Sequence, residues 1–383
     1  MFEKDRTLFG HPRELQNYYA KQTKGIFTMK NLVILGGGYG GLRMLHRLLP
    51  NQLPEDRSIT LIDRNPYHCL KTEYYGLAAG TIPDHHIRVA FPEHPQLHSV
   101  YGEILSVDLE NKQVILKDQE PVSYDDLVIG LGCEDKFHNI PGADIYTHSI
   151  QTIDKTRQTY QALNNLGNGA TVSIVGGGLS GVELASELIE SRPDLHIRLF
   201  DRGPHILSAF PERLSTYVES WFKKHTIDIV HHSNITKVEP NTLYNGDEPV
   251  HSDVIVWTAG IQPSKIVRDL DVKKDKQGRV ILTPQHFLPN DDSVFVVGDC
   301  ASLPQAPSAQ LAEGQAEQIV TVLVKKWANE PLPESFPVIK LKGTLGSLGS
   351  KHGFGLVGER QITGRMARLL KSGILWLYKY HNG

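Results

Sequence analysis

Short apolar runs, each followed by a glycine cluster and then by a stretch with helical periodicity, set the organisation of this chain. The first unit has an apolar run at residues 32–35, a glycine cluster at 36–41 and a helical pattern at 42–49 that Pro50 closes. Another apolar run, at residues 59–62, ends in Asp63. This order predicts a strand, a glycine-rich turn, a helix and a second strand.

The same order occurs again, and its first glycine, Gly176, lies 140 positions after Gly36. Residues 172–175 form the apolar run, residues 182–190 have the helical pattern, and a final apolar run ends in Asp201. A repeat of this length indicates a duplicated domain, because the units of solenoids are much shorter.

Further patterns lie between and after the two copies. Residues 107–109 and 113–116 predict a hairpin, and residues 310–327 form the longest predicted helix. Buried strands are expected at 127–129, 254–257 and 294–297. The alternation of strands and helices predicts an α/β fold with two Rossmann-like, dinucleotide-binding domains built on parallel sheets.

Composition removes several classes of function. The 383 residues carry a formal net charge of −3, which argues against a broad nucleic-acid-binding surface. The three cysteines, Cys69, Cys133 and Cys300, are far apart, so a disulfide framework, a thiolate metal cluster and a dithiol relay are not expected. The histidines show no metal-ligand spacing, and we expect no metal site.

The glycine clusters have the context that dinucleotide binding requires. In each copy the first glycine permits a tight turn, the middle one admits the pyrophosphate, and the last lets helix and strand pack closely. Asp63 lies 22 residues after Gly41, and Asp201 lies 20 residues after Gly181, where an acid binds ribose hydroxyls. The candidate ligand-binding residues are Gly36, Gly38, Tyr39, Gly40, Gly41, Asp63 and Arg64 in the first copy, and Gly176, Gly178, Gly181 and Asp201 in the second.

Two such sites suggest one flavin and one nicotinamide, so we expect FAD and NADH as cofactors. A carboxylate at Asp201 accepts a ribose 2′-OH and repels a 2′-phosphate, which favours NADH over NADPH, although Arg202 beside it weakens the inference. The Gly298-Asp299 pair after a late strand is expected to support the flavin.

These residues together resemble a type II NADH dehydrogenase, the single-subunit NADH:quinone oxidoreductase. The similarity runs from about Lys30 to Tyr380 and is most specific from Gly176 to Leu188. The resemblance implies hydride transfer from NADH to FAD, then electron transfer to a membrane quinone without proton pumping. It also implies flavin contacts at Thr72, Gly132 and Ala309, a contact with NADH at Gly260, and catalytic roles for Glu183 and Gln310.

The resemblance also implies a domain organisation. We expect an FAD-binding domain in two parts, residues 29–148 and 268–328, with an inserted NADH-binding domain at 149–267. A C-terminal segment, residues 329–383, would cover the flavin and meet the membrane. Residues 1–28 are polar and aperiodic, so we treat them as an extension before a functional start at Met29.

The acceptor side departs from the family. A second glutamine commonly follows the first by four residues, but here Gly314 holds that position and Gln315 is one residue late, about 100° round a helix. The quinone site is therefore in doubt. A soluble NADH-dependent reductase with a redox-protein acceptor and a non-catalytic NADH-sensing flavoprotein stay open as alternatives.

The tail decides the expected location. Met366, Leu369, Leu370, Ile374 and Leu377 recur at helical spacing among basic residues, which is typical of an in-plane membrane anchor and equally of a helix packed on its own core. No signal peptide or spanning segment is evident. We expect a cytoplasmic protein, peripheral on the inner face of the membrane, with a homodimer as a further candidate assembly.

Overall fold

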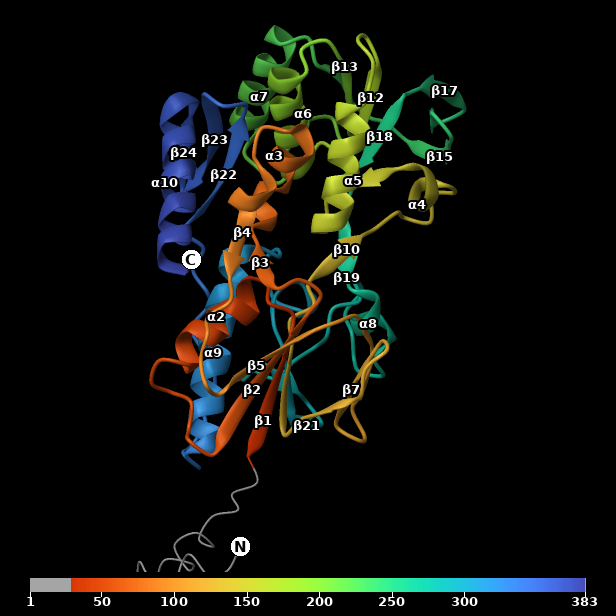
Figure 1. Ribbon diagram of the computed structural model, residues 1–383. Helices are drawn as coiled ribbons and strands as arrows, with labels where there is room; N and C mark the ends of the chain where they lie inside the picture. Colours follow the sequence, from red (N-terminus) through yellow and green to blue (C-terminus); the bar gives the residue numbers. More distant parts are fainter. Residues whose placement is uncertain (1–28, 383) are drawn as a thin grey trace, which may run out of the picture.

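The computed structural model describes residues 29–382, so the predicted extension at 1–28 lies outside the described residues. Two largely parallel sheets, one above the other in Figure 1, confirm the predicted α/β class, and only the edge strand of the lower sheet, residues 287–288, pairs antiparallel. The lower sheet has the order β20 (Phe287–Leu288), β21 (Asp291–Val296), β9 (Asp126–Ile129), β1 (Lys30–Leu35), β2 (Arg57–Asp63) and β5 (Leu97–Tyr101). The upper sheet has the order β11 (His148–Ser149), β18 (Val254–Trp257), β12 (Thr171–Val175), β13 (His196–Phe200) and β14 (Asp228–Val230).

Both faces of the lower sheet are buried, as parallel sheets require. On β1, Leu32 and Ile34 join the core cluster beneath the helices, while Val33 and Leu35 join the cluster on the opposite face. The helices on the first face are α2 (Tyr39–Leu48) and α9 (Ala309–Trp327). The opposite face is covered in part by β6 (Ile104–Asp108), β7 (Gln113–Leu116) and β8 (Val122–Ser123), and β6 and β7 confirm the predicted hairpin.

Helices also cover the upper sheet, and a narrow ribbon joins it to the lower one (Figure 1). The ribbon pairs β10 (Cys133–Asp135) with β19 (Ile261–Pro263). The helices of this half are α3 (Tyr74–Ala79), α4 (Ala143–Tyr146), α5 (Ile153–Asn164), α6 (Leu179–Ser191) and α7 (Glu212–Lys224). The smaller elements are β3 (Tyr67–Cys69), β4 (Arg88–Ala90), β15 (Ile235–Glu239), β16 (Thr242–Asn245), β17 (Glu248–His251), α8 (Lys265–Asp269), and the 3-10 turns η2 (Lys71–Glu73), η3 (Asp84–Ile87) and η4 (Gly298–Cys300).

The C-terminal part forms a three-stranded antiparallel sheet and a long helix on one side of the molecule (Figure 1). Its elements are β22 (Gly343–Leu348), β23 (His352–Val357), β24 (Arg360–Thr363) and α10 (Gly364–Asn382). Some strands of the lower sheet precede the strands of the upper sheet in the sequence, and others follow them. This is the order expected of a domain that is split by an insertion. The domain boundaries near residues 148, 267 and 328 stay predictions.

Both helices after the glycine clusters start three residues earlier than their periodicity predicted. The reason is local: Gly38 and Gly178 are the N-caps, so α2 and α6 begin at the residues that follow them. The last glycines, Gly41 and Gly181, therefore lie within the first helical turn.

Candidate functional site

The turn between β1 and α2 leaves no room for side chains at two glycines. Gly36 has φ +94°, and a Cβ there would lie 2.5 Å from the carbonyl oxygen of Gly130. A Cβ on Gly41 would lie 2.1 Å from the carbonyl oxygen of Gly36. Gly40 is also close-packed, since its Cβ would lie 2.9 Å from Val297. The close approach of helix, turn and neighbouring strand depends on these glycines.

The turn between β12 and α6 repeats this geometry in the upper sheet. Gly176 has φ +114°, and a Cβ there would lie 2.7 Å from the backbone of Thr258. A Cβ on Gly181 would lie 2.0 Å from the carbonyl oxygen of Gly176. The two predicted copies therefore agree in space as well as in sequence.

An acid holds each turn from the end of the next strand. The carboxylate of Asp63 accepts the N–H of Gly37 at 2.7 Å and that of Asn65 at 2.8 Å. Asp201 accepts the N–H of Gly177 at 2.9 Å and that of Gly203 at 2.7 Å. Each oxygen keeps a further lone pair for a ribose hydroxyl. Burial raises the pKa of Asp63, while these amides and the exposed Arg64 beside it act in the opposite direction.

The start of each helix is open toward a ligand. Among the described residues, no side chain caps α2 or α6, so the first amides of both helices are available to an anion. A Cβ on Gly38 or Gly178 would meet no described atom within 4 Å. Bare amides, open space and a dipole that favours negative charge fit the pyrophosphates of FAD and NADH.

Residues predicted to flank the flavin gather near the first turn. The hydroxyl groups of Tyr39 and Thr72 lie 3.1 Å apart, and Thr72 belongs to η2. Gly132 has φ +64° and no described atom within 4 Å of a Cβ position. Its carbonyl oxygen accepts the thiol of Cys300, which follows Asp299 in η4. The fold therefore places Tyr39 beside Thr72, and Gly132 beside η4, which contains Asp299.

Gln315 explains part of the departure on α9. Its side chain is fully buried, accepts the N–H of Gly298 at 2.8 Å and donates to the carbonyl of Val296 at 2.9 Å. Gln315 thus holds the turn that is predicted to support the flavin, and its amide is not available to contact an electron acceptor. Sequence spacing showed that this glutamine was displaced but gave no sign of its partner.

The N-terminal part of α9 is covered by residues 333–343, which we call the strap. A Cβ on Gly314 would lie 2.5 Å from Ile339 of the strap. Gln310 donates to the carbonyl of Gly343 and accepts the N–H of Lys342, each at 2.8 Å. Both ends of the Gln310 amide therefore bind the strap. Ala309 is the first residue of α9, after the N-cap Ser308.

Glu183 lies in a buried ionic cluster that the sequence did not reveal. It is 4% exposed, and its Oε1 accepts the N–H of Ser347 at 2.8 Å and the ammonium of Lys371. Lys371, which is 7% exposed, comes from α10 and also donates to the hydroxyl of Tyr75 at 2.6 Å. Glu73 lies 3.7 Å from the same ammonium.

Burial controls the charge of this cluster. Desolvation raises the pKa of Glu183 to about 7, although Lys371 acts against the shift. Burial alone would lower the pKa of Lys371, but the charges of Glu183, Tyr75 and Glu73 raise it above its ordinary value. Lys371 therefore stays protonated, whereas the pKa of Glu183 lies near neutral pH. Burial also raises the pKa of Glu73, and the charge of Lys371 opposes that shift.

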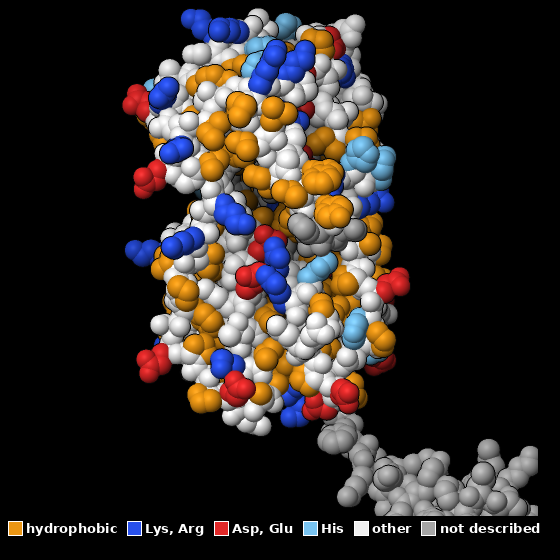
Figure 2. Space-filling view, turned by 90° about the vertical axis from the view of Figure 1, so that its left-hand side faces the viewer, with side chains coloured by type: hydrophobic (Ala, Val, Ile, Leu, Met, Phe, Trp, Pro, Cys, Tyr) orange, Lys and Arg blue, Asp and Glu red, His pale blue; other side chains and the backbone are white. Residues whose placement is uncertain are grey.

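The tail helix also settles how its apolar stripe is used. Ala367 and Lys371 face inward, whereas Leu369, Ile374 and Trp376 are 66%, 57% and 63% exposed. The alternative in which the stripe packs on the protein's own core is wrong. Figure 2 shows hydrophobic side chains gathered on this face of the molecule, with lysines and arginines around them.

Gly260 lies at the edge of the second site, after β18. Its φ is +117°, and the preceding carbonyl of Ala259 is bonded to Nε2 of His138 at 2.7 Å.

None of the helices between residues 29 and 382 combines the length and apolar character that a membrane span needs. Within the same residues, no cluster of three histidine, cysteine or acidic side chains has metal-binding geometry.

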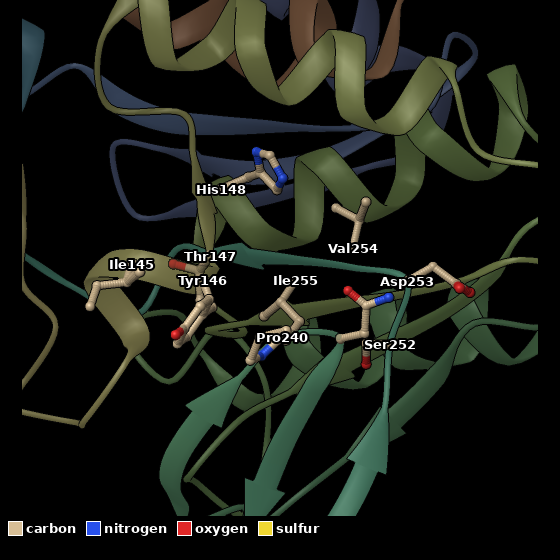
Figure 3. Close-up of a pocket in the computed structure, with 10 residues that line it drawn as sticks. Ile145, Tyr146, Thr147, His148, Pro240, Ser252, Asp253, Val254 and Ile255 are labelled. Atoms are coloured by element: carbon tan, nitrogen blue, oxygen red, sulfur yellow. The ribbon is translucent and has the colours of Figure 1, made fainter.

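A separate pocket of about 260 Å³ lies between the end of α4 and the start of β18 (Figure 3). Tyr146, His148, Asp253 and Ile255 contribute to its lining, and no predicted site residue does. The chemistry described above is concentrated at the glycine turns, so the pocket is not the candidate site.

Comparison with known proteins places these features in a family. The family model described as pyridine nucleotide-disulphide oxidoreductase matches residues 30–316. A protein of Bacillus subtilis named NADH dehydrogenase-like protein YutJ is 69% identical and covers 93% of this chain and its own full length. A type II NADH:quinone oxidoreductase of Haemophilus influenzae is 29% identical over 84% of this chain and 86% of that protein.

Solved structures agree on the fold. The structure of NDH2 from Plasmodium falciparum in complex with NADH superposes with a TM-score of 0.79 at 16% identity, over 92% of this chain and 96% of that one. In the described residues of the present chain, Cys69, Cys133 and Cys300 are free thiols. The chain belongs to the pyridine nucleotide-disulphide oxidoreductase family, as an NADH dehydrogenase-like oxidoreductase with FAD and NADH as its cofactors.

Proposed function

We propose that this protein is a type II NADH:quinone oxidoreductase that passes electrons from NADH through FAD to a membrane quinone, without proton pumping, at the inner face of the cytoplasmic membrane. The observation that carries the proposal is the position of α10. This helix exposes Leu369, Ile374 and Trp376 on one side and inserts Lys371 beside Glu183 on the other. A quinone is a lipid-soluble acceptor, so a site that serves it is best placed next to such a helix.

The residues of the two turns would bind and orient the cofactors. FAD, when bound, supplies the redox chemistry: it accepts a hydride from NADH and passes electrons to the acceptor. The amides at the start of α2 and the residues Asp63, Thr72, Gly132 and Asp299 are proposed to hold it. The amides at the start of α6, with Asp201 and Gly260, are proposed to hold NADH. The catalytic contribution of these residues is proximity and orientation.

Glu183 and Lys371 are proposed to support the acceptor half of the reaction. Reduction of a quinone to a quinol takes up protons as well as electrons. Glu183 changes charge near neutral pH, and Lys371 and Tyr75 donate hydrogen bonds within the same buried cluster. This cluster can therefore hold a proton and release it close to the second glycine turn. Gln310 is proposed to act indirectly, by fixing the strap.

One observation favours a second candidate, a soluble reductase with a redox-protein acceptor. Ile339 of the strap covers Gly314, where the family commonly has its second glutamine, and Gln310 is fully engaged by the strap backbone. Neither position offers a free amide to a quinone head group. A homodimer stays a prediction under either candidate.

Flotation with lipid vesicles separates the two candidates. The holoenzyme should float with vesicles that contain anionic lipid, and vesicles loaded with menaquinone should reoxidise its NADH-reduced flavin. A variant with Leu369→Glu and Ile374→Glu should keep its stability and lose flotation, because both side chains are exposed. Failure of the native protein to float, together with unchanged quinone reduction by the variant, would contradict the membrane proposal.

A further inference from the structure

The second glycine of each turn, Gly37 or Gly177, is held at both its N–H and its carbonyl group, but the two turns use different donors to that carbonyl. In the upper sheet, Asp201 accepts the N–H of Gly177, and the backbone N–H of Leu207 donates to the carbonyl of Gly177 at 2.7 Å. In the lower sheet, Asp63 accepts the N–H of Gly37. There the carbonyl of Gly37 is bonded to Nδ1 of His68 at 2.9 Å.

The partners of His68 fix its tautomer. Because a carbonyl oxygen only accepts, Nδ1 must carry the hydrogen, and the neutral ring presents Nε2 as an acceptor. The hydroxyl of Tyr378 lies 3.3 Å from Nε2 and donates to it. His68 is 1% exposed, and burial lowers its pKa to about 4, so the neutral form holds at physiological pH.

Tyr378 comes from α10, which brings the tail helix to the first glycine turn. Its ring lies 5.6 Å from the ring of Tyr39, and the ring of Tyr39 lies 4.8 Å from that of His68. Tyr39 is the first residue of α2, whose amides face the phosphate position. Burial raises the pKa values of Tyr39, to about 12, and of Tyr378, so both phenols stay protonated and can donate.

We propose that His68 and Tyr378 are positioning residues for FAD, with His68 holding the Gly37 peptide of the phosphate-binding turn and Tyr378 holding His68. The turn for NADH is completed by its own backbone, whereas the turn for FAD is completed by a side chain that α10 supports. The tail helix therefore sets the flavin turn, and FAD binding depends on a helix whose other face is exposed and apolar.

FAD titration of the apoprotein tests the proposal. The probe is FAD itself, followed by the loss of its fluorescence on binding, and the variants are His68→Ala, His68→Asn and Tyr378→Phe. Asparagine places an amide N–H close to the position of Nδ1 and lacks the distal acceptor. His68→Ala should raise the Kd for FAD about tenfold, because it removes the donor to Gly37. His68→Asn and Tyr378→Phe should each raise it about threefold, and the double variant should match either single one.

Controls separate positioning from general stability. His98→Asn changes an exposed histidine on β5 and should leave the Kd for FAD unchanged. The thermal midpoint of the apoprotein should change little in His68→Asn and Tyr378→Phe, while the gain in midpoint on adding FAD should shrink. The Kd for NADH of FAD-loaded protein should be unaffected, because Leu207 completes that turn.

The proposal fails if His68→Ala leaves the Kd for FAD unchanged, or if apoprotein and FAD-loaded protein lose the same midpoint with no change in Kd. If His68→Ala does not fold, Tyr378→Phe decides. The proposal is supported if Tyr378→Phe raises the Kd for FAD in the native background but not in the His68→Asn background. It is overturned if Tyr378→Phe leaves that Kd unchanged, or raises it equally in both backgrounds.

Discussion

Removing Lys371 should have a large and specific effect, because it leaves buried carboxylates without their cation. Glu183 and Lys371 are 4% and 7% exposed, and Glu73 lies 3.7 Å from the same ammonium. Breaking a buried pair by deleting one partner costs about 3–5 kcal/mol. We expect Lys371→Met to lower the free energy of unfolding by that amount, since methionine keeps the apolar stem and removes only the charge.

A second substitution should relieve the cost. Glu183→Gln in the Lys371→Met background removes the uncompensated charge, so the double variant should be more stable than the sum of the two single effects, with a coupling energy of about 1–3 kcal/mol. Equilibrium urea unfolding, followed by near-ultraviolet circular dichroism, measures all four proteins. Lys351→Met, an exposed lysine between β22 and β23, is the control and should change the free energy by less than about 0.5 kcal/mol. A loss below about 1 kcal/mol for Lys371→Met, or strict additivity of the two substitutions, would show that Lys371 does not compensate the charge of Glu183.

Three further predictions concern the nucleotide turns and pH. Gly178→Ala should change the free energy of unfolding by less than about 0.5 kcal/mol, because its Cβ would meet no described atom, but it should weaken NADH binding, because that open space is where the pyrophosphate is proposed to lie. Gly181→Ala should also lower the free energy of unfolding by about 1–3 kcal/mol, since its Cβ would lie 2.0 Å from a carbonyl oxygen. Urea unfolding and NADH titration of the flavin-loaded protein check both, and equal destabilisation would count against the open cradle. Asp201→Asn should raise the Kd for NADH about tenfold, because one of the two amide contacts is lost. It should also reduce the preference for NADH over NADPH, because the carboxylate that repels a 2′-phosphate is gone. An unchanged preference in parallel titrations would remove Asp201 from the site. The pKa of Glu183 is raised from 4.5 to about 7, so its contribution to stability is complete below pH 4.5 and is lost as the pH rises through 7. Glu183→Gln should remove that part of the pH dependence of unfolding, and identical profiles would contradict the shift.

Local patterns were sufficient to predict the fold. Strands, helices and tight turns follow from hydrophobic periodicity and from glycine positions, and both are properties of neighbouring residues. The second turn shows this clearly: the sequence placed Gly176, Gly181 and Asp201, and in the structure they form one compact loop. The bounds of single elements were less exact. Two helix starts were displaced because the glycine N-caps have no apolar periodicity of their own, and the first strand of the hairpin is Ile104–Asp108 rather than 107–109.

Long-range partners were beyond reach of the sequence. Lys371 and Glu183 are 188 residues apart, and nothing local distinguishes Lys371 from the other basic residues of the tail. Periodicity showed that Leu369 and Ile374 share a face of α10, but it could not show that this face points to solvent. Gln315 likewise looked like the family's second glutamine shifted by one residue, whereas its buried amide binds the turn at Gly298.

The proposed route of electrons runs from NADH through FAD to a membrane quinone. Anaerobic mixing of the flavin-loaded protein with NADH, followed by menaquinone in vesicles, tests it most directly through the visible absorption of the flavin. We expect NADH to bleach the flavin and the quinone to restore its colour within the time of a turnover. Bleaching without reoxidation by quinone would contradict the proposed acceptor, and the absence of bleaching would contradict the NADH dehydrogenase activity itself.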